Sequence, residues 1–207
     1  MSNAVLDAPA ETAFEFLEPD ALPMDDLLTQ AEDVRFELVD GALLERNMSM
    51  ESSFIGMKIG RRLDQFIEQS QLGYVFGPDA GYQCFAEDRL RIRKPDVSFI
   101  SRERMLPEDF LKGFCPIVPD LAVEVVSPND LADDLSQKVE EYLQAGVKLI
   151  WVIHPRTRSA SVFRTDGSTA LLHVHEAFSG ETVIPGFECP LASVFPPTVA
   201  PSKTVSE

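Results

Sequence analysis

Long apolar runs are absent from this 207-residue chain, and cysteine is scarce. A membrane-spanning helix needs about 20 consecutive apolar residues, and no stretch of the sequence approaches that length. The N-terminus has neither the basic start nor the apolar stretch of a secretory signal. Three widely spaced cysteines, Cys84, Cys115 and Cys189, fit neither a disulfide framework nor a zinc site. We therefore expect a single-domain cytoplasmic protein with reduced core thiols and no membrane contact.

Basic residues are also in short supply, with 18 Lys and Arg against 34 Asp and Glu. The resulting net charge of −16 argues against a nucleic-acid partner, because contacts with phosphate need Lys and Arg. Much of the acidity precedes the expected core, since residues 1–40 hold eleven acidic groups and one basic group, Arg35. Residues 1–20 are predicted to be a flexible acidic leader, which weakens the objection without removing it.

Two common catalytic motifs are missing as well. The sequence contains no Gly-x-Ser-x-Gly nucleophile motif and no glycine-rich loop that would cradle a phosphate. Nucleophilic serine chemistry of the hydrolase type and nucleotide binding by a P-loop are therefore not indicated.

The order of predicted elements indicates a mixed sheet. Asp40-Gly41 predicts the tight turn of a hairpin, and Gly73 and Gly146 are each predicted to end a helix. The elements are a helix near 23–30, a hairpin over 35–46, a helix over 52–73, a strand-turn-strand over 82–101, a buried strand over 121–126, a helix over 130–145, a buried strand over 147–155 and a hairpin over 159–178. This order predicts an α/β (α+β) domain over 21–195, with a mixed β-sheet flanked by helices and a flexible tail over 196–207.

Glu124 interrupts the apolar strand "LAVEVV" over 121–126. The neighbouring residues are those of a strand that is buried on both faces. A buried, unpaired carboxylate costs several kcal/mol unless it takes up a proton. The sequence therefore predicts a compensating positive charge near Glu124.

Lys138 and Asp96 are the other charges at positions where the pattern predicts apolar residues. Lys138 shares the core-facing stripe of its helix with Leu131, Leu135 and Tyr142. Its ammonium either extends outward to water or lies beside Glu124, and both interpretations remain open. Asp96 follows Pro95 and opens the apolar run "DVSFI". It can lie opposite Glu124 if the two strands are neighbours.

Two carboxylates on adjacent strands and a lysine form a recognisable chemical unit. Carboxylate oxygens hold Mg²⁺ or Mn²⁺ while leaving positions for water and a phosphate oxygen. A lysine beside them can stabilise the negative charge that builds up during phosphoryl transfer. The pattern predicts a metal-dependent phosphodiesterase.

These residues carry a resemblance to a known family. Pro95-Asp96, then Glu124-x-Val126, then Lys138 resemble the PD-(D/E)XK nuclease superfamily in the variant whose lysine lies on a helix. The blocks "RFELVDG", "RKPDVSFIS", "PDLAVEVVSPND" and "DDLSQKVEEYLQAGVKLIWVIHP" resemble, in that order, the restriction-endonuclease-like family called Uma-two. The resemblance implies a restriction-endonuclease-like core and a metal-dependent DNA endonuclease, a hydrolase.

The resemblance also assigns residues. It implies that Asp96 and Glu124 bind Mg²⁺ or Mn²⁺ and that Lys138 is catalytic, and it suggests Glu37 as a further acidic member of the site. The chain departs from the family pattern at peripheral positions, where it has Ala42, Ser52 and His154.

The DNA-binding surface and the function itself each have more than one interpretation. Arg91, Arg93 and Lys94, together with Arg89, either line a DNA groove that leads to Asp96 or form a solvated face. The main alternative function is a catalytically inactive nuclease-fold protein that binds nucleic acid or a protein partner. A second alternative is a hydrolase that acts on another phosphoester. A homodimer is compatible with cutting two strands.

Overall fold

The computed structural model describes residues 24–33, 35–46, 48–128 and 130–197. The predicted leader lies outside these residues, as does the predicted tail beyond residue 197. Within the described ranges, no helix has the length and apolar character needed to cross a membrane.

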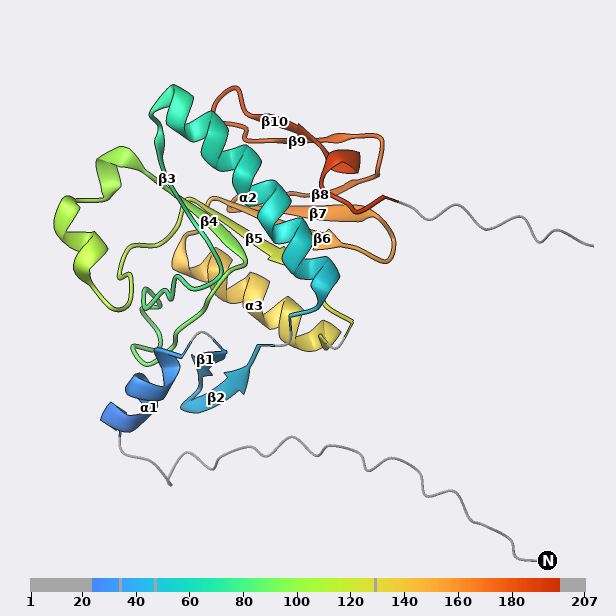
Figure 1. Cartoon of the computed structure of the whole chain (residues 1–207). Coiled ribbons are helices and arrows are strands. Elements are labelled where there is room, and N and C mark those ends of the chain that lie inside the picture. The colour runs from blue at the N-terminus through green and yellow to red at the C-terminus, as the bar shows by residue number, and fades with distance from the viewer. Residues whose placement is uncertain (1–23, 34, 47, 129, 198–207) are drawn as a thin grey trace, which may run out of the picture.

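Most of the predicted elements are present in the expected order, and the strands at Gly73–Phe76 and Glu188–Pro190 were not predicted (Figure 1). The α-helices are α1 (Met24–Ala31), α2 (Met50–Ser70) and α3 (Ala132–Ala145). The strands are β1 (Phe36–Val39), β2 (Ala42–Glu45), β3 (Gly73–Phe76), β4 (Val97–Ser101), β5 (Leu121–Val125), β6 (Leu149–His154), β7 (Ser159–Arg164), β8 (Thr169–Leu172), β9 (Ala177–Ser179) and β10 (Glu188–Pro190). Short 3₁₀ turns lie at Arg102–Arg104, Pro107–Leu111 and Leu191–Ser193.

A six-stranded mixed sheet forms the centre of the domain, with strand order β3-β4-β5-β6-β7-β8. Strands β5 and β6 are parallel, and α3 connects them, because a parallel pair needs a crossover that a tight turn cannot supply. Each of the other neighbouring pairs is antiparallel. The predicted mixed sheet flanked by helices is confirmed.

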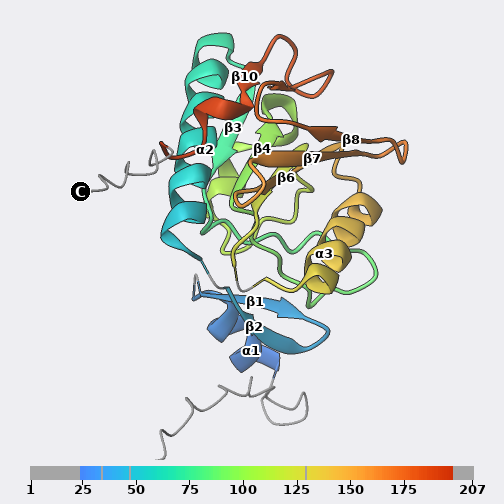
Figure 2. The ribbon, with the colours of Figure 1, turned by 90° about the vertical axis from the view of Figure 1, so that its right-hand side faces the viewer.

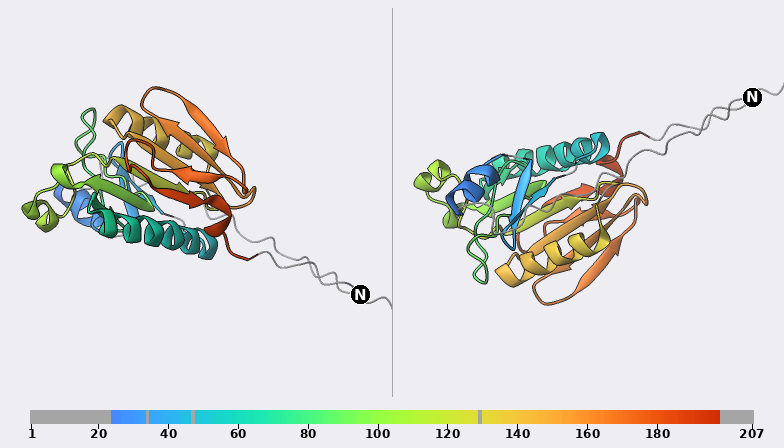
Figure 3. Two further views of the ribbon diagram at one scale, coloured as in Figure 1. Left: turned by 90° about the horizontal axis from the view of Figure 1, so that it is seen from above. Right: turned by 90° about the horizontal axis from the view of Figure 1, so that it is seen from below.

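Helices α2 and α3 cover opposite faces of this sheet (Figure 3). Alternate residues of β5 point to the two sides, so Val123 packs toward α2 whereas Ala122 packs toward α3. The α2 side also receives residues of β9 and β10, including Phe178 and Cys189. Burial on both faces explains why β5 and β6 are almost wholly apolar.

The β1–β2 hairpin and α1 form a separate layer at one end of the sheet (Figure 2). Asp40 and Gly41 both have positive φ, at 50° and 78°, as the predicted two-residue turn requires. Leu27 and Ala31 of α1 pack with Leu38 of β1 and with Ile92 in a small core. This layer brings the hairpin against the ends of β4 and β5.

The segment before β4 differs from the predicted strand-turn-strand over 82–101. Regular pairing begins only at Val97, and Ile92 and Arg93 form isolated bridges with Leu38 and Tyr82. Alternation of charged and apolar residues predicts a half-solvated strand, but here the side chains of Arg91 and Arg93 form ion pairs with the buried Glu141.

The end of α2 also differs from the prediction. The helix ends at Ser70, and Gln71 adopts the left-handed conformation (φ 55°) that was expected of Gly73. Gly73 instead begins β3, where a Cβ would lie 2.2 Å from the carbonyl oxygen of Ile100. Glycine is required here because strand β4 approaches the backbone closely.

Gly73→Ala should therefore destabilise the protein by about 1–3 kcal/mol, the usual cost of forcing extra atoms into a packed site. Gly77→Ala is the matched control, because nothing lies within 4 Å of a Cβ at that position. The free energy of unfolding, measured in urea, should stay within about 0.5 kcal/mol of the wild type for the control. Equal stability of the two variants would contradict the close approach.

Candidate active site

Asp96 and Glu124 lie close together where β4 and β5 meet. Val97, the first residue of β4, pairs with Val123 of β5, so Asp96 directly precedes this pair in one strand and Glu124 directly follows it in the other. Asp96 Oδ2 accepts a hydrogen bond of 2.7 Å from the backbone N–H of Val125, and both carboxylates are buried. The pairing of β4 with β5 thus brings together two acids that are 28 residues apart in the chain.

Lys138 reaches Glu124 from α3. Its Nζ lies 3.0 Å from both carboxylate oxygens of Glu124, and its side chain is only 14% exposed. One turn later, the Tyr142 hydroxyl donates a hydrogen bond of 2.9 Å to Glu124 Oε1. Lys138 therefore does not extend to water. Leu131 does not share its environment, since it precedes the helix and is 64% exposed.

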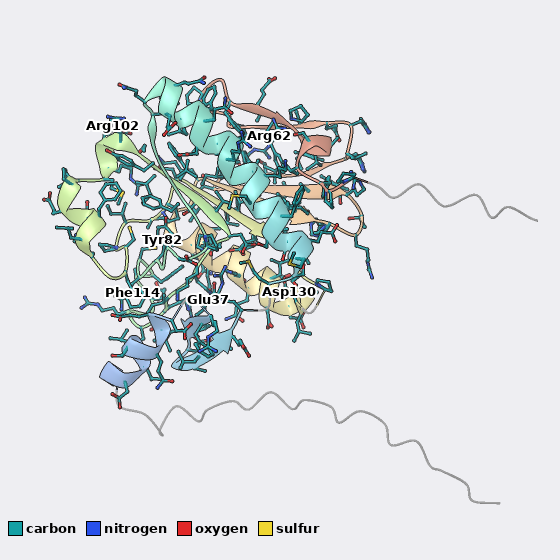
Figure 4. All side chains as sticks on the ribbon, viewed as in Figure 1. Glu37, Arg62, Tyr82, Arg102, Phe114 and Asp130 are labelled. Carbon is teal, nitrogen blue, oxygen red and sulfur yellow. The ribbon has the colours of Figure 1, made fainter. Side chains whose placement is uncertain are left out.

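Glu37 brings a third carboxylate to the site from the hairpin (Figure 4). Lys138 Nζ lies 2.9 Å from Glu37 Oε1, so a single ammonium bridges Glu37 and Glu124. The same Oε1 accepts the backbone N–H of Lys94 at 2.8 Å, and Oε2 accepts from Arg93 Nη1 at 3.0 Å. Glu37 thus has two cationic partners, Lys138 and Arg93. It is accordingly suited to orienting Lys138 rather than to holding a metal ion.

Arg93 and Lys94 do not line a surface groove. Arg93 is 4% exposed and donates to Glu141 Oε2 at 2.6 Å in addition to its contact with Glu37. Lys94 is 1% exposed, and its Nζ donates to the carbonyl oxygens of Ala31 and Asp33, each at 2.7 Å. These carbonyls close the C-terminus of α1, where a positive charge is favourable. The prediction that Arg93 and Lys94 are available to DNA is wrong for this conformation.

Arg91 is also engaged by acidic groups. Its guanidinium forms an ion pair with Asp40 in the hairpin turn and lies 3.5 Å from Glu141 Oε1. Glu141, on α3, is itself buried. No local pattern predicts that burial, because the arginines that Glu141 meets come from a distant segment.

Arg46, at the end of β2, is a site residue that the sequence analysis missed. Its Nη2 donates to Asp96 Oδ1 at 3.1 Å, and its Nη1 donates to the carbonyl oxygen of Pro78 at 2.8 Å. Its Nε lies 3.9 Å from Glu37 Oε1. The only sequence signal is its position directly after the hairpin that carries Glu37.

The three carboxylates differ in how well their charges are compensated. Burial raises the pKa of Glu124 to about 7 in spite of Lys138, and the negative charge of Asp96 acts in the same direction as burial. Burial likewise raises the pKa of Asp96 above its usual value. Burial also opposes ionisation of Glu37, but Lys138 and Arg93 lower the pKa of that group to about 2. Asp96 and Glu124 each have one cationic partner, Arg46 and Lys138 respectively, but at both of them burial outweighs that partner and disfavours the ionised form.

The carboxylates of Asp96 and Glu124 could bind a divalent ion that keeps most of its coordinated water molecules. In the part of the chain that the structure describes, no group of three or more His, Cys, Asp or Glu side chains is arranged to enclose a metal. Mg²⁺ is usually bound through one or two carboxylates together with water and substrate phosphate oxygens, and Asp96 and Glu124 can supply such a pair.

Comparison with solved structures finds the same fold. A crystal structure described as a putative nuclease belonging to DUF820, from Anabaena variabilis, superposes with a TM-score of 0.73. The likeness covers 84% of this chain and 97% of that chain, at 17% sequence identity. At this level of identity the match shows a shared fold.

Comparison with sequences gives a family. No curated protein matches the chain. A family model named Uma2, with the description "Putative restriction endonuclease", matches residues 20–192. Because this match spans most of the sequence, the chain belongs to the Uma2 family.

Proposed function

We propose that this protein is a metal-dependent endonuclease that hydrolyses phosphodiester bonds, with DNA as its substrate. One observation supports this most directly. Lys138 contacts Glu124 within hydrogen-bond distance, beside a second buried carboxylate, Asp96, in a protein of a nuclease-like family. The description of the family as "Putative restriction endonuclease" and that of the structural neighbour as a putative nuclease point to the same reaction class.

Asp96 and Glu124 are the residues that would hold Mg²⁺ or Mn²⁺. Such an ion supplies Lewis-acid stabilisation of the negative charge on the phosphoryl oxygens. Their raised pKa values support this assignment, since a bound cation would relieve the repulsion between the two carboxylates. Tyr142 holds Glu124 in place by donating to Oε1.

Lys138 would act on the phosphoryl group from the helix side. A compact ammonium fixed in a partly dry site stabilises developing negative charge better than one in water. Glu37 keeps this ammonium charged and oriented from the opposite side, at 2.9 Å. Cutting both strands of a duplex would require a second site, which a two-fold homodimer would provide.

Thermal stability should report metal binding directly. At pH 8, Mn²⁺ at about a hundredfold excess over its Kd should raise Tm by roughly 5–10 °C through mass action. The response should weaken from pH 8 to pH 6, because Glu124 takes up a proton with a pKa of about 7. Glu124→Gln should abolish the response, whereas Glu140→Gln, on the exposed side of α3, should retain it. An unchanged wild-type Tm at millimolar Mg²⁺ and Mn²⁺ would contradict metal binding.

The pH dependence of stability should carry the signature of Glu124 in metal-free buffer with a chelator. Its pKa is raised from 4.5 to about 7 in the folded protein, so its contribution is present below pH 4.5 and is lost as pH rises through 7. Glu124→Gln should remove a decline on the order of 1–3 kcal/mol between these pH values. Chemical unfolding across this range measures it, with Glu140→Gln as the control. A variant with the wild-type slope would exclude a raised pKa at Glu124.

Lys138→Met isolates the catalytic charge while keeping the side-chain stem. Cleavage of plasmid DNA with Mg²⁺ or Mn²⁺ should fall by about 10² or more, because the transition state loses a stabilising charge. Lys138→Arg should restore little, since a planar guanidinium does not replace a compact ammonium.

Lys138→Met should also lower stability, because the ammonium of Lys138 links the buried carboxylates of Glu37 and Glu124. Without Lys138, Glu37 and Glu124 lose their shared cation, so stability should drop by about 3–5 kcal/mol in the absence of metal. Rates should therefore be measured well below Tm. Lys148→Met, at a 55% exposed side chain paired with Asp120, is the control and should cut at the wild-type rate. Wild-type cleavage by Lys138→Met would refute the catalytic role, and a wild type that binds but never cuts DNA would favour the inactive, binding alternative.

A further inference from the structure

Arg46 donates to the oxygen of Asp96 that does not accept from the backbone of β5. Asp96 Oδ2 is engaged by the backbone N–H of Val125 at 2.7 Å. Asp96 Oδ1 remains, and Arg46 Nη2 donates to it at 3.1 Å. The side chain of Arg46 is only 12% exposed, so solvent screens its charge weakly.

A divalent ion and this guanidinium would not share Asp96 without cost. A metal ligated at about 2.0–2.6 Å from Oδ1 would lie within a few ångströms of the guanidinium. Like charges at such separations repel strongly when they are partly removed from water. Lys138 already contributes a further positive charge, 3.0 Å from the other proposed ligand, Glu124.

Further contacts fix the position of Arg46 beside Asp96. Nη1 donates to the carbonyl oxygen of Pro78 at 2.8 Å, and Nε faces Glu37 at 3.9 Å. The backbone of the hairpin positions the residue, because Arg46 N donates to Arg35 O at 2.7 Å directly after β2. These three contacts hold the side chain of Arg46 in the position from which it reaches Asp96.

We propose that Arg46 competes with the divalent cation for Asp96, and that this competition determines the metal concentration needed to fill the site. This inference rests on the proposed metal site. In the metal-free protein the guanidinium neutralises Asp96, and metal binding requires that the Nη2 contact be given up. The free protein consequently binds metal more weakly than the carboxylate pair alone would.

A purely structural role for Arg46 makes the opposite prediction. If the residue only fastens the hairpin to the sheet, its removal should lower stability and leave metal affinity unchanged or reduced. Competition predicts that affinity rises when the residue is removed. The sign of the change therefore separates the two roles.

The test is a calorimetric titration of the full-length protein with Mn²⁺ at pH 8, where ionisation of the carboxylates is favoured. Arg46→Met should bind Mn²⁺ about tenfold more tightly than the wild type, as expected for loss of a charge-assisted contact to the ligand. Arg164→Met is the charge-matched control. Arg164 pairs with Glu181 and lies opposite Leu149, at the end of the sheet away from Glu124. The Arg164→Met variant should therefore bind Mn²⁺ with the affinity of the wild type.

A second variant covers the case in which Arg46→Met does not fold. Arg46→Lys keeps the charge, but one ammonium is less able to serve both Pro78 O and Asp96, so affinity should rise about twofold to fivefold. Wild-type affinity in whichever variants fold would overturn the competition, while metal-dependent cleavage by the wild type would leave the proposed function standing. Failure of the wild type and both variants to bind Mn²⁺ would instead overturn the metal site, and the competition with it.

Discussion

The ammonium of Lys138, held between Glu37 and Glu124, is the interaction on which the arrangement of this domain depends. It joins the hairpin, the central sheet and α3 through contacts of 2.9 and 3.0 Å. Removing ions from water costs several kcal/mol for each ion, and good geometry with further hydrogen bonds must offset that cost. Arg93, Tyr142 and the backbone of Lys94 supply those bonds here. The position of the hairpin is therefore set by charge pairing as well as by its small apolar core.

Within this network the charges are divided unequally, and the division has chemical consequences. Glu37 is compensated by Lys138 and Arg93, which lower its pKa to about 2. Burial dominates at Asp96 and Glu124 and raises their pKa values. Glu37 thus remains ionised and orients Lys138. Asp96 and Glu124 would each be stabilised in the ionised form by further positive charge. Strong perturbation of this kind, inside a cluster of acids and a lysine, is typical of functional sites.

The buried cations also change what the net charge of −16 means. Arg93 and Lys94 are enclosed by protein acceptors, and Arg46, Arg91 and Lys138 have side chains at most 14% exposed. These five of the 18 basic groups stabilise the domain from within rather than offering charge to a polyanion. In the proposed function, the divalent ion would therefore supply much of the positive charge that a phosphate group meets at this site.

Local sequence patterns were sufficient for most of the elements and for the unusual positions of Glu124 and Lys138. The Asp40-Gly41 turn, the doubly buried β5, and α3 closed by Gly146 each follow from the residues within one element, as does the location of Glu124 and Lys138 on core-facing positions. Whether the ammonium of Lys138 reaches Glu124 or water was left open by the sequence. Periodicity and turn chemistry act over a few residues, so a sequence displays them directly.

Only the tertiary structure decided where the remaining charges point. Arg93 meets Glu141 and Glu37 across 48 and 56 residues, and Arg46 meets Asp96 across 50. The alternation that predicted a solvated basic strand is the same whether its arginines face water or buried acids. Pairing over such separations depends on how the hairpin, the sheet and α3 come together, and the free energy of a buried ion pair depends on its partners and on the loss of water. The sequence by itself determined which charged residues stand at core-facing positions, and the tertiary structure determined which groups compensate their charges.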